Sequence, residues 1–149
     1  MNKLFTIIIA ITAYALMPAV ADSFQLPKSE SELISRFKQF HAAGDLAGLM
    51  SLKYNEGYPD ELRTIDEQML DDLLKKDIVS ISVEEIPAPM LEMMKSGLPY
   101  QDMILVPNIT PAKLLKVTLS PGEGMTDYQA PIGIKNGIWY LTSTKPKEE

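Results

Sequence analysis

Residues 130–141 read Ala130-Pro-Ile-Gly-Ile-Lys-Asn-Gly-Ile-Trp-Tyr-Leu141, and this stretch decides more about the fold than any other part of the chain. Apolar positions alternate up to Ile134, and a second apolar run begins at Ile138. Between the two runs stands Asn136-Gly137, the pair that best tolerates the positive backbone angles of a tight turn. We therefore predict an antiparallel hairpin whose returning strand runs from Ile138 to Thr144.

The same two-residue alternation occurs in segments that precede the hairpin. It covers residues 78–84, residues 115–119 and the residues from Tyr128 to the start of the hairpin. Turn residues at 121–124 separate the second of these segments from the third. Alternation of this kind is typical of strands with one buried face. The second half of the chain is therefore predicted to form an antiparallel sheet, apart from an irregular middle between the first two of these strands.

The first half of the chain carries helical patterns. Residues 29–43 open with Ser29 and carry Glu32 three positions later, as in a capping box, and residues 45–52 form a short second helix after Gly44. Residues 60–76 show a longer apolar repeat. Helices first and strands after, without regular alternation, predict an α+β domain with its N-terminal helices packed on one antiparallel sheet.

Three segments make the chain resemble the nuclear transport factor 2 like superfamily. They are Phe37-Lys-Gln-Phe40-His41-Ala-Ala-Gly44-Asp45, Leu52-Lys53-Tyr54 and the hairpin of residues 130–141. The resemblance implies a cone-like domain with a curved sheet, and it implies either an isomerase, dehydratase or cyclase or a noncatalytic binding or assembly module. The helix predicted at residues 60–76 departs from the family pattern, in which a strand follows the short helix.

The N-terminus has the three parts of a secretory signal. Lys3 precedes an apolar run over residues 4–17, and small side chains at Ala19 and Ala21 suit the signal peptidase. The run is shorter than the roughly 20 apolar residues that span a bilayer, so no membrane anchor is expected after cleavage. We predict a signal peptide at 1–21 and a single domain at 22–149, with an ordered core at 28–144 and a short charged tail. The expected location is periplasmic, with secretion as the alternative.

Charge and cysteine content restrict the function. The chain has 14 basic and 20 acidic residues, and loss of Lys3 with the signal lowers the formal charge from −6 to −7. This charge disfavours nucleic acid and anionic lipid as partners. Because the chain has no cysteine, disulfides, thiolate metal sites and lipid attachment are excluded. We predict neither a cofactor nor a metal.

Few residues are suited to catalysis. His41, the only histidine, is either a general base in a pocket or a partly buried helix residue, and the second interpretation is favoured. Asp127 beside Tyr128, and Glu84-Glu85, could imitate the carboxylate and tyrosine pairs of the family's enzymes. No family motif surrounds them, so no catalytic residue is predicted. Met90, Met93 and Met94 share one side of a helical turn, which suits a lid over a pocket better than a Cu(I) site.

The leading hypothesis is an exported, noncatalytic envelope protein that binds a small apolar ligand or a protein partner. The first alternative is a cofactor-independent isomerase or lyase with His41 or a buried carboxylate as base. The second is an assembly module that pairs through its sheet as a homodimer, with Tyr128 or Tyr140 in the contact. The residues predicted to line a ligand pocket are His41, Tyr54, Tyr58, Met90, Met94, Tyr128 and Trp139.

Overall fold

The computed structural model describes residues 25–148. The predicted signal peptide, including Ala19 and Ala21, lies outside these residues. The described part begins with three helices, α1 (Glu30–Ala42), α2 (Leu46–Ser51) and α3 (Asp60–Leu74), at the positions predicted from the sequence. None of the helices within residues 25–148 is long and apolar enough to cross a membrane.

The helix ends follow from local side-chain chemistry. The Ser29 hydroxyl accepts a hydrogen bond from the backbone N–H of Glu32 at 3.1 Å, and the Glu32 carboxylate accepts one from the N–H of Lys28 at 2.7 Å. Gly44 has φ +63° directly after α1, and Asp45 caps α2 by accepting from the N–H of Gly48 at 2.8 Å. The corner between α1 and α2 is therefore fixed by residues that the sequence had indicated.

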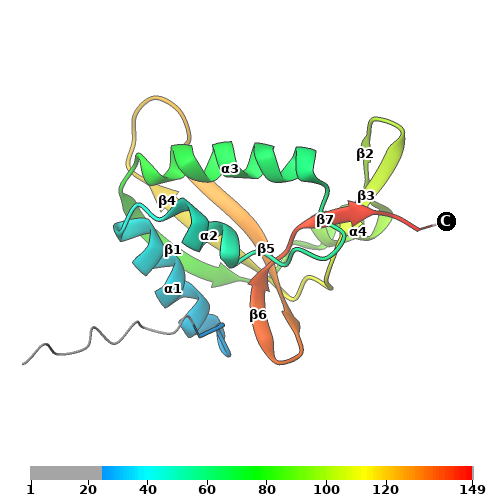
Figure 1. Ribbon diagram of the computed structural model, residues 1–149, viewed down its shortest axis with the longest axis horizontal. Coiled ribbons are helices and arrows are strands. Elements are labelled where there is room, and N and C mark those ends of the chain that lie inside the picture. The colour runs from blue at the N-terminus through cyan, green and yellow to red at the C-terminus, as the bar shows by residue number, and fades with distance from the viewer. Residues whose placement is uncertain (1–24, 149) are drawn as a thin grey trace, which may run out of the picture.

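The main sheet is antiparallel and has four strands in the order β1-β4-β5-β6. The strands are β1 (Ile78–Glu84), β4 (Lys113–Leu119), β5 (Asp127–Lys135) and β6 (Ile138–Leu141). In the turn between β5 and β6, Asn136 has φ +52° and Gly137 φ +77°, as expected for the Asn-Gly hairpin. In Figure 1, α3 runs across the front of β4 and β5.

A second antiparallel sheet corrects the prediction of a single sheet. It has the order β2-β3-β7, with β2 (Leu98–Tyr100), β3 (Met103–Pro107) and β7 (Thr144–Pro146), and helix α4 (Ala88–Ser96) precedes it. The returning strand predicted for residues 138–144 is therefore two strands in different sheets. The predicted boundary of the core at residue 144 falls inside β7, whose next two residues pair with β3. All three strands of this sheet contain a proline, which weakens a strand signal.

The buried core joins the first three helices to the main sheet. Its members from the helices include Leu33, Phe37, Leu49 and Leu70, and its members from the strands include Leu115 and Ile132. The rings of Phe37 and Tyr128 stack with their centroids 6.1 Å apart. The fold class is α+β, with four helices and two antiparallel sheets within the described residues.

Candidate functional site

A cavity of about 360 Å³ lies where the two sheets and two of the helices meet. Its walls come from α3, α4, the β2–β3 hairpin, β5 and the crossing from β6 to β7. We call it the methionine cavity because four of the nine methionines of the chain line it, namely Met69, Met90, Met93 and Met94. Its volume lies within the range of about 300–1,000 Å³ that is typical of small-molecule sites.

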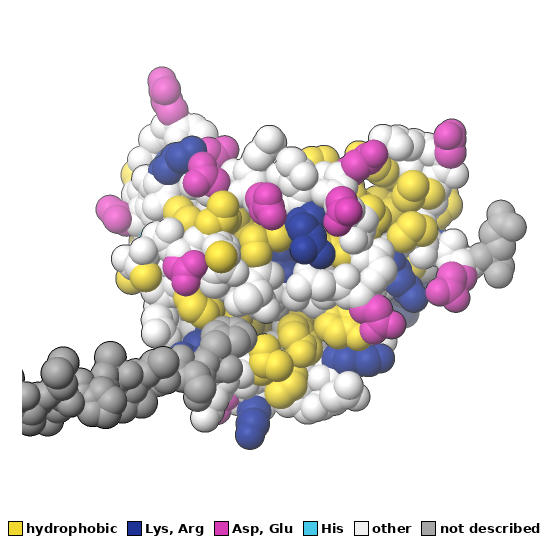
Figure 2. Space-filling view, in the orientation of Figure 1, with side chains coloured by type: hydrophobic (Ala, Val, Ile, Leu, Met, Phe, Trp, Pro, Cys, Tyr) yellow, Lys and Arg dark blue, Asp and Glu magenta, His cyan; other side chains and the backbone are white. Residues whose placement is uncertain are grey.

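Helix α4 supplies three of the four methionines of the cavity. Positions 90, 93 and 94 are at i, i+3 and i+4, so their side chains share one side of the helix, and that side faces the cavity. The helix has no fully buried residue, and so its apolar side is not part of the main core. Figure 2 shows hydrophobic side chains gathered where α3 faces the β2–β3 hairpin. Flexible thioethers of this kind adapt to ligands of varied shape.

A polar cluster of Lys53, Tyr58 and Asp66 forms another part of the wall. The ammonium group of Lys53 lies 2.6 Å from a carboxylate oxygen of Asp66, and the two side chains are 5% and 21% exposed. The Tyr58 hydroxyl donates to the same carboxylate, and the carbonyl oxygen of Leu62 is a second acceptor at 3.2 Å. Burial raises the pKa of Tyr58 above its usual range, and the hydrogen bond to Asp66 raises it further.

Two cations lie near the ring of Tyr58. Lys53 Nζ lies 5.6 Å from the ring centroid, and the guanidinium carbon of Arg63 lies 5.7 Å from it. Both distances are within the range of a cation–π contact. Tyr128, the second tyrosine of the cavity, is 4% exposed, and burial followed by the nearby charge of Asp66 raises its pKa.

Four of the seven predicted lining residues come together in this cavity. They are Tyr58, Met90, Met94 and Tyr128. Because Tyr128 is buried against Phe37, it does not lie on an exposed sheet face. Tyr54 and Trp139 are not among the residues that line the cavity: Tyr54 donates through its hydroxyl to Glu56 and meets Tyr140 edge-on, and Trp139 packs at the margin of the core.

His41 also lies apart from the methionine cavity. Its Nε2 atom is 2.8 Å from the carbonyl oxygen of Lys76 and 3.4 Å from that of Leu73, so this nitrogen is the donor. The ring therefore donates to the chain where α3 ends, chiefly to the carbonyl oxygen of Lys76, two residues beyond the helix. This contact supports the interpretation of His41 as a partly buried helix residue.

The carboxylates considered from the sequence for catalysis are exposed. Asp127, Glu84 and Glu85 all lie at the surface. The carboxylate in the cavity is instead Asp66, and sequence reasoning missed both Asp66 and Lys53. A signal was present, because Asp66 lies four residues after Leu62 and three before Met69, on the apolar face of α3. A charged residue at such a position needs a buried partner.

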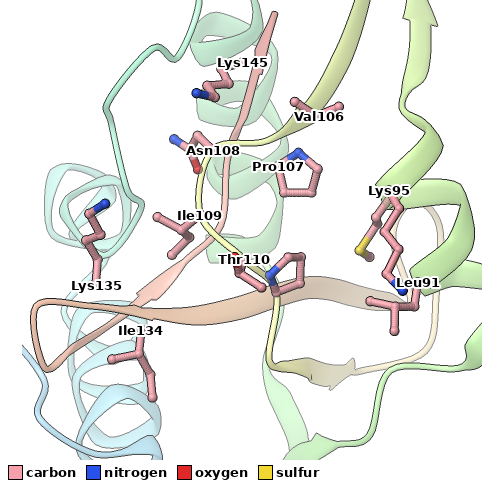
Figure 3. A pocket seen from close by; sticks show the side chains of 12 residues that line it. Leu91, Lys95, Val106, Pro107, Asn108, Ile109, Thr110, Ile134, Lys135 and Lys145 are labelled. Carbon is pink, nitrogen blue, oxygen red and sulfur yellow. The ribbon is translucent and has the colours of Figure 1, made fainter. Parts of the chain in front are cut away.

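A second pocket, of about 570 Å³, lies beside the loop at residues 108–111. Figure 3 shows Ile109 and Thr110 of this loop with Lys95, Lys135 and Lys145 on different sides of the pocket. Lys95 pairs with Glu92 at 3.3 Å and Lys145 with Glu148 at 3.7 Å. The lysines do not converge on one point, so the second pocket is a weaker candidate than the methionine cavity. Among residues 25–148, no group of three or more His, Cys, Asp or Glu side chains could hold a metal ion.

Comparison with known proteins adds no relative. The chain matches no protein-family model, and neither a curated protein nor a solved structure is significantly similar to it.

Proposed function

We propose that this protein is a noncatalytic binding protein that holds a small apolar molecule in the methionine cavity. The observation that carries the proposal is the convergence of four methionines from two helices on one concave site of about 360 Å³. A concave apolar site with a few polar groups is the usual form of a small-molecule pocket, whereas protein interfaces are flatter. We therefore favour a small molecule over a protein partner.

The polar groups of the cavity favour binding over catalysis. A general base needs a free lone pair within reach of its substrate. Asp66, the one carboxylate among the described residues of the lining, is paired with Lys53 and accepts from Tyr58 through the same oxygen, and His41 does not line the cavity. These arrangements argue against the isomerase or lyase alternative.

Export and family membership are further parts of the proposal. The signal sequence at residues 1–21 supports export to the periplasm, where a cysteine-free domain needs no redox partner. The helix order and the closing hairpin support a domain similar to the nuclear transport factor 2 like superfamily, with the cone-like packing of helices on a curved sheet. In that superfamily, the second sheet and α4 of this chain would be additions that build the cavity.

Binding can be tested with phenylnaphthylamine, an uncharged dye whose fluorescence rises in apolar surroundings. We expect saturable binding to one site, and we expect Met90→Asp to weaken it at least about tenfold because a carboxylate would enter the apolar wall. Ile134→Asp is the matched control, since Ile134 is 50% exposed and lines only the second pocket. Nonsaturable binding, or equal losses in both variants, would contradict the proposal.

A further inference from the structure

The two charged side chains that line the buried part of the methionine cavity, Lys53 and Asp66, neutralise each other. Lys53 is 5% exposed, and its only ion pair within the described residues is the contact of 2.6 Å with Asp66. A buried ammonium group must be compensated, and Asp66 provides this compensation. The backbone of Lys53 is also fixed, because its N–H donates to the carbonyl of Met50 at 3.1 Å and the residue bridges to Leu141 of β6. The ion pair is therefore a fixed part of the cavity wall.

This neutral pair discriminates between ligand head groups. A carboxylate that approached Lys53 would also approach Asp66, so attraction and repulsion would largely cancel. An ammonium group that approached Asp66 would meet Lys53 in the same way. Either charged head would lose its water without gaining a net partner, and this desolvation is unfavourable. An uncharged head avoids the penalty.

Residues with hydroxyl groups line the same cavity as the ion pair. Thr142 and Ser143 are buried, line the cavity and follow Leu141, whose carbonyl accepts from the N–H of Tyr54 at 2.9 Å. The Oγ atom of Ser143 has no hydrogen-bond partner within the described residues, but it is enclosed by the protein. The hydroxyl-bearing ring of Tyr128 lines the same cavity. Together with the ion pair, Thr142 and Tyr128 therefore give the lining its hydrogen-bonding groups.

The lining is apolar both at its exposed and at its buried positions. Ile65 and Met93 are 50% and 48% exposed, whereas Leu105 and Leu114 are 6% and 4% exposed. A ligand of this cavity therefore needs an apolar body besides its hydrogen-bonding head.

We infer, building on the proposed function, that the methionine cavity takes ligands with an uncharged, hydrogen-bonding head and an apolar body, such as alcohols or amides. Fatty carboxylates and alkylamines are discriminated against by the Lys53–Asp66 pair.

The test is displacement of phenylnaphthylamine by decanol, decanoate and decylammonium at neutral pH, since the three ligands share one alkyl chain. We expect decanol to bind at least about tenfold more tightly than either charged ligand. If decanoate or decylammonium displaces the dye as well as decanol does, the inference is overturned while the proposed function stands. If the dye itself does not bind, the proposed function fails and the inference fails with it.

A substitution at Asp66 gives a second test. It compares the ratio of two ligand affinities between proteins, so differences in ligand solubility cancel. Asp66→Asn leaves the charge of Lys53 uncompensated, so the ratio of decanoate affinity to decanol affinity should rise at least about tenfold. Glu67→Gln removes the same charge from the neighbouring exposed position of α3 and should leave the ratio unchanged. Thermal unfolding establishes that each variant folds, and the comparison of the three ligands on the unaltered chain decides the matter if Asp66→Asn does not fold. An unchanged ratio in folded Asp66→Asn would overturn the inference.

Discussion

At the scale of single residues, the two tyrosines of the methionine cavity connect stability to pH. The pKa values of Tyr58 and Tyr128 are both raised above the usual value near 10, chiefly by burial. In the unfolded chain these phenols lose their protons near pH 10, whereas in the folded chain they keep them. The folded state therefore binds more protons above about pH 10, and the free energy of unfolding should fall as the pH rises beyond that value.

Urea unfolding at about pH 8 and about pH 11 measures this effect. Because lysines also titrate in this range, the tyrosine part is isolated by comparing the unaltered chain with Tyr58→Phe and Tyr128→Phe. Each variant should show a smaller loss of stability between the two pH values. Parallel losses in all three proteins would contradict the assignment.

The structural role of His41 depends on the hydrogen bond from its Nε2 atom to the carbonyl oxygen of Lys76. His41→Ala removes the donor that lies 2.8 Å from the Lys76 carbonyl, and it should lower the free energy of unfolding by about 1 kcal/mol. Dye binding should be unchanged, because the ring does not line the methionine cavity. His41→Gln, which keeps a donor, should recover part of the loss. A large loss of binding in a folded His41→Ala protein would reassign His41 to the site.

Residue types, but not their partners, could be predicted from the sequence. Tyr58, Met90, Met94 and Tyr128 were placed near a pocket because aromatic and thioether side chains commonly line one. Asp66 was missed because its burial depends on Lys53, a residue 13 positions away whose ammonium group is 2.6 Å from it. Contacts over such a separation are set by the packing of α3 on the segment after α2, and no local pattern encodes this packing.

At the scale of elements, α4 is held in place by the glycine that ends it. Gly97 has φ +93°, and a Cβ atom there would lie 2.3 Å from a side-chain carbon of Ile104 and 3.0 Å from the carbonyl oxygen of Leu105. Gly97→Ala should therefore push α4 away from β3, lower the free energy of unfolding by about 2–3 kcal/mol and weaken dye binding.

Gly124→Ala is the control for that prediction. Gly124 has φ +84° but no atom within 4 Å of the added Cβ, so the variant carries the backbone strain without the clash. It should cost about 1 kcal/mol and leave dye binding intact. Thermal and urea unfolding, combined with dye titration, compare the two variants. If Gly97→Ala and Gly124→Ala change stability and dye affinity equally, the clash at residue 97 is relieved without movement of α4, and the prediction is wrong.

The elements also divide into those that a sequence pattern can find and those that it cannot. The caps at Ser29 and Asp45 and the Asn136-Gly137 turn are local, and each was placed correctly from the sequence. The second sheet is built from strands of three to five residues that contain Pro99, Pro107 and Pro146. Segments this short have no measurable alternation, and pairing of β3 with β7 depends on residues far apart in the chain.

At the scale of the whole molecule, one side chain links the second sheet to the helices. The amide group of Asn108 donates to the carbonyl oxygens of Tyr54 at 2.7 Å and Glu56 at 3.1 Å. Its oxygen accepts from the N–H of Ser143 at 2.9 Å. Asn108 follows β3, Tyr54 follows α2 and Ser143 lies in the crossing from β6 to β7, so three separate parts of the chain meet at this residue.

Asn108→Ala should therefore disturb both stability and the cavity. Three backbone groups lose their partner, and we expect the free energy of unfolding to fall by about 2–3 kcal/mol. Because Ser143 and Thr144 line the methionine cavity, dye affinity should fall as well. Asn55→Ala, at an exposed asparagine in the neighbouring turn, should change stability by less than about 0.5 kcal/mol. If Asn108→Ala loses stability but keeps full dye affinity, the backbone hydrogen bonds of Ser143 and Thr142 hold the crossing without the Asn108 side chain, and the cavity wall does not depend on that side chain.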